Sequence, residues 1–199
     1  TTAGEVLETL IPTYNGQKLT LNDLSFNKEG DLYVTDWQGS CDDPTGGVFL
    51  LSAESGYSQA IPVAEGMGGP NGLSLSPDEK TIWVGEHNCN IVSKIDLETG
   101  NVTTVYENEG EGAPDSNKVD ASNNLYQAMN HAGRIDVLNT DGELIQRVTI
   151  PGSEQGLYQM STNLAIKPGT NEAFLVTAGQ SGEGQWIFTF KAQDKAPVL

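Results

Sequence analysis

A motif that recurs four times along the chain constrains its fold more than any other feature. Each copy opens with a small polar residue and continues through a short alternating run and a turn rich in Asp, Asn, Gly or Pro. A second strand with an aromatic residue follows. The opening residues are Asn22, Asn71, Asp115 and, with a weaker match, Asn163, separated by 49, 44 and 48 residues. A period of this length with several short strands per unit is typical of propeller blades.

The sequence after each motif completes the unit. A third strand follows each aromatic strand, and "DLETGNV" and "NTDGELI" predict hairpin turns into a fourth. No apolar pattern of helical period is long enough for a substantial helix. We predict a single all-β domain over residues 1–199, a β-propeller with blades of four antiparallel strands. The expected blades are 19–65, 66–110, 111–158 and 159–199, and residues 1–18 are the outer-strand tail of a preceding blade. A β-sandwich is the all-β alternative, but it gives no reason for the period.

The charge of the chain limits its partners. Its 27 acidic and 10 basic residues give a formal charge of −17. This balance argues against nucleic acid and anionic membranes as partners, since both require a basic surface. It is compatible with cation binding, although most of the acids are expected to form a solvated surface. No window approaches the roughly 18 consecutive apolar residues of a membrane span.

The two cysteines, Cys41 and Cys89, form no CxxC pair, and there are only two histidines. We therefore expect free thiols in a reduced, cytoplasmic protein, and no zinc site built from cysteine and histidine. The N-terminal segment has neither the basic start nor the apolar core of a signal peptide. It also lacks an initiator Met, so we expect the native N-terminus to lie outside this sequence.

The repeat predicts a polar ring. The first strands of propeller blades line the central channel in the same direction, so Asn22, Asn71 and Asp115 converge at one end, with Ser116 beside them. Amide, carboxylate and hydroxyl oxygens are the ligands that hard cations such as Ca²⁺ prefer. The alternative is that these residues only form Asx-turns where the strands start.

Four stretches of the chain together resemble the gluconolactonase/senescence-marker-protein family, and most closely its bacterial drug-responsive lactonases. They are "LNDLSFNKEGDLYVTDWQGSCDDPTGGVFLLS", "GPNGLSLSPDEKTIWVGEHNCN", "GAPDSNKVDASNNLYQAMNHAGRIDVLNTDGELI" and "IPGSEQGLYQMSTNLAIKPGTNEAFLVTAG". Each motif is short and degenerate, but their order and spacing are specific. The resemblance covers nearly the whole chain.

The resemblance implies a six-bladed propeller that hydrolyses lactones with a divalent metal at the channel mouth. The metal is commonly Ca²⁺, with Mg²⁺, Mn²⁺ or Zn²⁺ as alternatives. The match to the family's motifs implies that Asn22 of "LND" and Asn71 of "PNG" face the metal or the substrate. Asp115 of "PDS" becomes the metal-bound catalytic carboxylate that acts as acid and base, with Ser116 next to the metal. Asp23 is a weaker candidate for substrate binding, as is His131 in the loop after a second strand.

The chain also departs from the family. It resembles the C-terminal two-thirds of a family that is roughly half as long again and has a metal-binding glutamate in its first blade. Glu5 and Glu8 lie in the expected outer strand and do not replace that glutamate. Four of six blades would leave two apolar faces uncovered. We therefore expect a fragment, a truncated product or self-association with another copy, and weak metal binding and catalysis.

Two other classes of function remain open. A propeller can act as a non-enzymatic binding scaffold, and the same fold could carry a sugar dehydrogenase or a phosphotriesterase. A scaffold gives no reason for Asn, Asn and Asp at one blade position. The family resemblance implies a small-molecule lactone as the partner.

Overall fold

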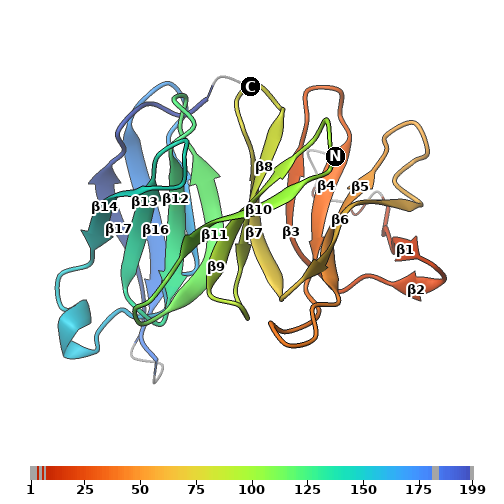
Figure 1. Ribbon diagram of the computed structural model, residues 1–199. Helices are drawn as coiled ribbons and strands as arrows, with labels where there is room; N and C mark the ends of the chain where they lie inside the picture. Colours follow the sequence, from red (N-terminus) through yellow and green to blue (C-terminus); the bar gives the residue numbers. More distant parts are fainter. Residues whose placement is uncertain (1–3, 5, 7, 181–183, 198–199) are drawn as a thin grey trace.

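The computed structural model describes residues 4, 6, 8–180 and 184–197 of the chain. Three four-stranded antiparallel sheets and one three-stranded sheet lie side by side, with β3–β6 at one end of the row and β15–β17 at the other (Figure 1). In these residues the helical content is one short 3-10 turn, η1 (Ser153–Gln155), and no helix is long and apolar enough to cross a membrane. The predicted all-β class with blade-like sheets is confirmed.

Each sheet is a meander in which consecutive strands pair. The first sheet consists of β3 (Leu21–Phe26), β4 (Leu32–Asp36), β5 (Gly46–Leu51) and β6 (Ala60–Met67). The second consists of β7 (Pro70–Leu75), β8 (Thr81–Glu86), β9 (Ile91–Asp96) and β10 (Val102–Glu107). The third consists of β11 (Ala113–Val119), β12 (Leu125–Asn130), β13 (Arg134–Leu138) and β14 (Leu144–Thr149).

The fourth sheet has three strands in the described residues: β15 (Asn163–Ile166), β16 (Glu172–Ala178) and β17 (Gln185–Lys191). The expected blade limits stay predictions, although β6 runs to Met67 and so passes the expected limit at residue 65. The two predicted hairpins are present, as β9–β10 and β13–β14.

The N-terminal segment differs from the expected outer strand. Residues 8–12 form no strand, and the hairpin of β1 (Thr13–Tyr14) and β2 (Gln17–Lys18) follows. An outer strand needs a neighbouring strand for its hydrogen bonds, and the described residues provide none there. Glu8 is exposed, and Glu5 lies outside the described residues.

The turns between first and second strands are closed by side chains. In the third sheet, Asp120 Oδ1 accepts hydrogen bonds from the backbone N–H groups of Ser122 and Asn124, both at 3.0 Å. In the first sheet, Asn27 Oδ1 accepts from Asp31 N at 2.8 Å. These Asx-type turns explain the Asn and Asp at this place in the first and third copies. In the second copy Ser76 takes the same place, and its Oγ accepts from Thr81 N at 3.0 Å.

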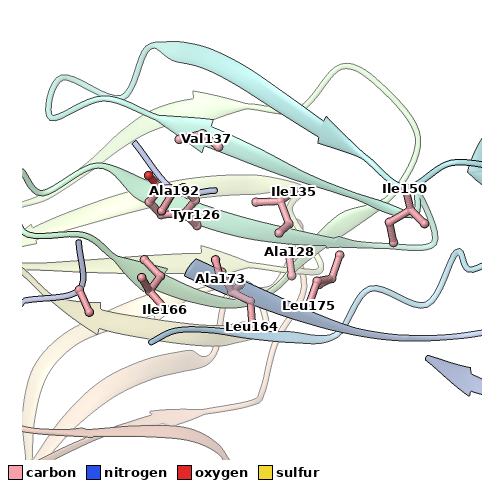
Figure 2. Close-up of a cluster of buried hydrophobic side chains, with 11 residues drawn as sticks. Tyr126, Ala128, Ile135, Val137, Ile150, Leu164, Ile166, Ala173, Leu175 and Ala192 are labelled. Atoms are coloured by element: carbon pink, nitrogen blue, oxygen red, sulfur yellow. The ribbon is translucent and has the colours of Figure 1, made fainter. Parts of the chain in front are cut away.

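Apolar side chains fill the space between adjacent sheets. Between the third and fourth sheets, the buried residues come from both sides and include Tyr126, Ile135, Leu164 and Leu175 (Figure 2). A second cluster joins the first and second sheets, and a third places Trp83 against residues of the third sheet. The hairpin and the segment after it add Tyr14 and Leu19 to the far side of the first sheet. Packing between neighbours therefore buries most sheet faces.

The outer face of the last sheet lacks such a cover among the described residues. Its side chains alternate along β17, and Ile187 is 69% exposed. Phe174 and Val176 on β16 are also exposed. At the other end of the row, Leu24 and Phe26 on β3 are exposed in the same way. Self-association through these faces stays a prediction.

We predict that Asp136→Asn destabilises the fold by about 3 kcal/mol, because it leaves the partly buried guanidinium of Arg134 without its anion. Asp136 is fully buried, and its carboxylate accepts hydrogen bonds from Arg134 Nε and the Tyr106 hydroxyl, both at 2.9 Å. As a control, Glu172→Gln removes an exposed ion pair with Lys167 at 3.2 Å, and its loss of stability should be much smaller than that of Asp136→Asn. Urea unfolding measures both, and equal losses would contradict the prediction.

Candidate functional site

The inner strands of the first three sheets carry an irregularity at the same place. The pairing with the second strand shifts register between Leu21 and Leu24, between Pro70 and Leu73, and between Pro114 and Asn117. The residues inside these shifts are Asn22–Asp23, Asn71–Gly72 and Asp115–Ser116. Bulges redirect side chains and occur often beside active sites. The predicted polar residues therefore occupy equivalent positions in three sheets.

Gly72 allows the second and third inner strands to approach closely. A Cβ atom on Gly72 would lie 2.5 Å from the backbone oxygen of Asp115 and from Cα of Ser116. In addition, Asn117 Nδ2 donates to the backbone oxygen of Gly72 at 3.1 Å. Because of this backbone contact, Asn71 and Asp115 are neighbours across two sheets.

Asp115 is a partly buried carboxylate. Burial raises the pKa of its carboxyl group above the usual range for aspartate, and the Asp23 carboxylate acts in the same direction. Ser116 N–H, His87 and the Asn71 amide lower the pKa, but burial prevails. The Ser116 N–H donates to Asp115 Oδ1 at 2.9 Å. A nearby cation would stabilise the ionised form of such a partly buried carboxylate.

Asn71 presents a buried amide oxygen beside Asp115. It is only 5% exposed, and its Oδ1 atom is buried without a hydrogen-bond partner in the described part of the chain. A buried polar atom without a partner is costly. Its backbone oxygen is satisfied, because Thr35 Oγ1 donates to it at 2.8 Å. The amide oxygen of Asn71 and the carboxylate of Asp115 are therefore a donor set that fits a hard cation.

The other predicted residues differ in their surroundings. Asn22 is exposed, and its side chain makes no hydrogen bond to the residues described. Ser116 is partly buried, and its N–H also lies 3.2 Å from the backbone oxygen of Thr162. Asp23 serves the fold, since its Oδ2 accepts from Leu73 N at 3.1 Å and so ties β3 to β7. Their roles in binding stay predictions.

Two carboxylates near this rim also belong to the fold. Glu86 is buried, with Oε1 accepting from Ser93 Oγ at 2.6 Å and Oε2 from Gly68 N at 2.9 Å. Asp36 is buried as well and accepts from Thr20 N at 2.6 Å. Neither supplies the glutamate that the resemblance implies. The described residues contain no group of three or more His, Cys, Asp or Glu that could hold a metal.

The weaker match, Asn163, does not extend the ring in the same way. It pairs with Val176 in a register without a shift, and it is exposed. Its Oδ1 accepts from Leu164 N at 2.8 Å. Since Ser116 N points to the backbone oxygen of Thr162, the residue before Asn163 is the one next to the third inner strand.

His87, rather than His131, lies beside Asp115. His131 is exposed in the turn after β12, and its backbone N–H donates to Asn130 Oδ1 at 3.0 Å. His87 follows β8, and its Nδ1 is 3.0 Å from the backbone oxygen of Pro114. The sequence analysis named His131 as the candidate. Both histidines directly follow the second strand of their units, so their position in the repeat does not distinguish them, and the contact of His87 with the third sheet does.

The expectation of free thiols is wrong, because Cys41 and Cys89 form a disulfide with Cα atoms 4.9 Å apart. Their separation of 48 residues is close to the repeat period, so they lie in corresponding loops of adjacent sheets. Disulfides are typical of oxidising compartments. The cysteines therefore do not support the expected cytoplasmic location, which stays a prediction.

A cavity of about 320 Å³ lies along the other ends of the inner strands. Its lining includes Phe26, Leu75, Val119 and Ile166. None of the predicted site residues lines it. The candidate site therefore lies outside this cavity, at the opposite ends of the inner strands.

Known proteins resemble this chain over nearly its whole length. The family model for the SMP-30/Gluconolactonase/LRE-like region matches residues 2–177. Lactonase drp35 of Staphylococcus saprophyticus subsp. saprophyticus is 35% identical over 185 residues, 89% of this chain and 56% of the relative. Lactonase drp35 of Staphylococcus haemolyticus is 34% identical over 199 residues, 95% of this chain and 60% of the relative. The chain thus spans less than two thirds of the curated relatives it matches.

Solved structures show the same fold. A gluconolactonase from Xanthomonas campestris superposes with a TM-score of 0.71 at 20% identity, covering 92% of this chain and 61% of that protein. The calcium-binding protein regucalcin from Agrobacterium tumefaciens gives a TM-score of 0.67 at 18% identity, covering 90% and 65%. These likenesses concern the fold, and they confirm the propeller class. With the family match and the relatives above one third identity, the sequence resemblance is also confirmed: the chain belongs to the SMP-30/gluconolactonase/LRE-like family.

Proposed function

We propose that this chain carries the rim of a site that hydrolyses lactones with the help of a divalent cation. The observation that carries the proposal is the buried, unpartnered Oδ1 of Asn71 beside the partly buried Asp115 carboxylate. The lactonases among the relatives support a cyclic ester as substrate. The regucalcin described as calcium-binding supports Ca²⁺ as the cation.

Asn71, Asp115, Asn22 and Ser116 would hold the cation, with oxygen atoms only. Asn71 and Asp115 contribute from a backbone frame fixed by Gly72, whereas the more exposed Asn22 would need to turn its amide inward. A bound cation would supply Lewis-acid polarisation of the lactone carbonyl and stabilise negative charge on its oxygen.

Asp115 would act first as the general base and then as the general acid of the reaction. Its carboxylate accepts a proton from the water whose oxygen bonds to the carbonyl carbon. When the bond between that carbon and the ring oxygen breaks, Asp115 returns the proton to the ring oxygen, and the product is a hydroxy acid. Burial suits this role, because a raised carboxyl pKa makes Asp115 a stronger base than an exposed aspartate.

A non-enzymatic scaffold is less well supported. It gives no reason to keep the Asn71 amide oxygen buried without a partner. No observation on the described residues favours a sugar dehydrogenase or a phosphotriesterase.

We predict that Asp115→Asn lowers kcat/KM for lactone hydrolysis about 100-fold or more, because the amide cannot accept the proton. Hydrolysis of a lactone panel, followed by acid release in excess Ca²⁺, measures the loss. Asp141→Asn is the matched control, since Asp141 lies in an exposed turn, and it should leave the rate unchanged. Equal activity of Asp115→Asn and the unmodified chain would contradict the role of Asp115.

We also predict that Ca²⁺ binding weakens as the pH falls, because a proton and the cation compete for Asp115. Since burial raises the Asp115 pKa, protonation begins at a higher pH than for an ordinary aspartate, and affinity falls over that range. Isothermal titration calorimetry at about pH 7.5 and about pH 5 measures the difference. Asp115→Asn should bind weakly without this pH dependence, and a wild-type affinity equal at both pH values would refute the prediction.

A further inference from the structure

Two loops from adjacent sheets are joined beside the candidate site. The loop after β4 carries Trp37, Gly39 and Cys41, and the turn after β8 carries Asn88 and Cys89. The disulfide links their ends, and Asn88 Nδ2 donates to the backbone oxygen of Gly39 at 2.7 Å. The two loops are therefore held together by a covalent bond and a hydrogen bond.

The turn after β8 is also fixed to the segment between the sheets. His87 N donates to the backbone oxygen of Gly69 at 3.0 Å, and Asn88 N to that of Gly68 at 3.2 Å. A Cβ atom on Gly68 would collide with the Sγ atom of Cys89. The disulfide thus lies directly on the backbone of this segment, and the turn has little room to move while the bond is intact.

His87 sits in this fixed turn and reaches the third sheet. Its Nδ1 is 3.0 Å from the backbone oxygen of Pro114, the residue before Asp115, and its ring packs on Trp37 with centroids 5.2 Å apart. A carbonyl oxygen can only accept a hydrogen bond, so Nδ1 must carry the proton. The contact ties the turn to the bulge that presents Asp115.

We propose that the Cys41–Cys89 disulfide is a redox-sensitive positioning element of the site. When oxidised, it holds the His87 imidazole as the Nδ1–H tautomer against the Pro114 carbonyl and so fixes the backbone that presents Asp115. When reduced, it releases the turn, and the His87–Pro114 hydrogen bond is lost. His87 is a positioning residue, and the effect on turnover rests on the proposed lactone hydrolysis.

The bond is open to reduction, because Cys41 is exposed. A water-soluble phosphine attacks one sulfur atom and supplies the two electrons that break the S–S bond. Two thiols form and the phosphine becomes a phosphine oxide, with its oxygen and the two thiol protons coming from water. The reaction leaves no adduct on the protein.

The first test observes the two imidazoles directly. The chain has only His87 and His131, so ¹H–¹⁵N spectra of the ring nitrogens contain two sets of signals, and exposed His131 serves as internal control. We expect an Nδ1–H signature for His87 in the oxidised protein. Phosphine reduction, or the double variant Cys41→Ser and Cys89→Ser, should shift His87 to the ordinary tautomer mixture while His131 is unchanged. Identical His87 signals in both states would overturn the proposal.

The second test uses lactone turnover in excess Ca²⁺. Reduction should lower kcat about tenfold with little change in KM, because the hydrogen bond that is lost positions Asp115 without touching the substrate. His87→Leu should have the same effect in the oxidised protein, whereas His87→Asn should retain most of the activity, because its Nδ2 can donate to Pro114. Equal losses in both variants would overturn the positioning role. If the oxidised chain hydrolyses no lactone, the proposed function fails, and the imidazole spectra still decide on the disulfide.

Discussion

Every sheet of this protein depends on its neighbour for the burial of its apolar faces. A sheet of three or four short strands has two faces, and the described residues include no helix that could cover one. Side chains from adjacent sheets therefore interdigitate, as Ile135 and Leu175 do (Figure 2). This packing sets the sheets side by side and brings their inner strands together. The candidate site is a consequence, because its residues come from strands that meet only when the sheets pack.

Most of the carboxylates near the rim accept hydrogen bonds from the backbone and so stabilise the fold. Asp36 and Glu86 bind backbone N–H groups of the segments that lead into their sheets, and Asp23 ties two inner strands together. In each case the carboxylate oxygens are taken up by hydrogen bonds that hold the backbone. Asp115 differs, since burial outweighs its few polar contacts. The distinction separates a carboxylate available for chemistry from carboxylates that hold the backbone.

Much of the fold could be predicted from the sequence, because the repeat marks its strands and turns directly. The aromatic strands, the hairpins and the common position of Asn22, Asn71 and Asp115 follow from it. The bulges could not be predicted, since they depend on backbone contacts such as that at Gly72. Residues 8–12 do not form the expected strand, because strand formation requires a partner, which local sequence does not reveal.

The repeat itself predicts the disulfide, because the two cysteines lie about one period apart. A separation of 48 residues is large along the chain but places Cys41 and Cys89 in corresponding loops of adjacent sheets. The same reasoning places His87 next to Trp37. In a repeat protein, residues one period apart are neighbours, so pairs should be sought at that spacing first.

The glycine at position 72 links the approach of two neighbouring sheets to the separation of two candidate site residues. With only hydrogen atoms on its Cα, the second and third inner strands touch through their backbones. Any larger residue would act as a wedge at the inner edge, turning the second sheet away from the third and moving Asn71 from Asp115. One position without a side chain therefore sets how closely the second and third sheets approach at their inner edge, and with it how far apart Asn71 and Asp115 lie.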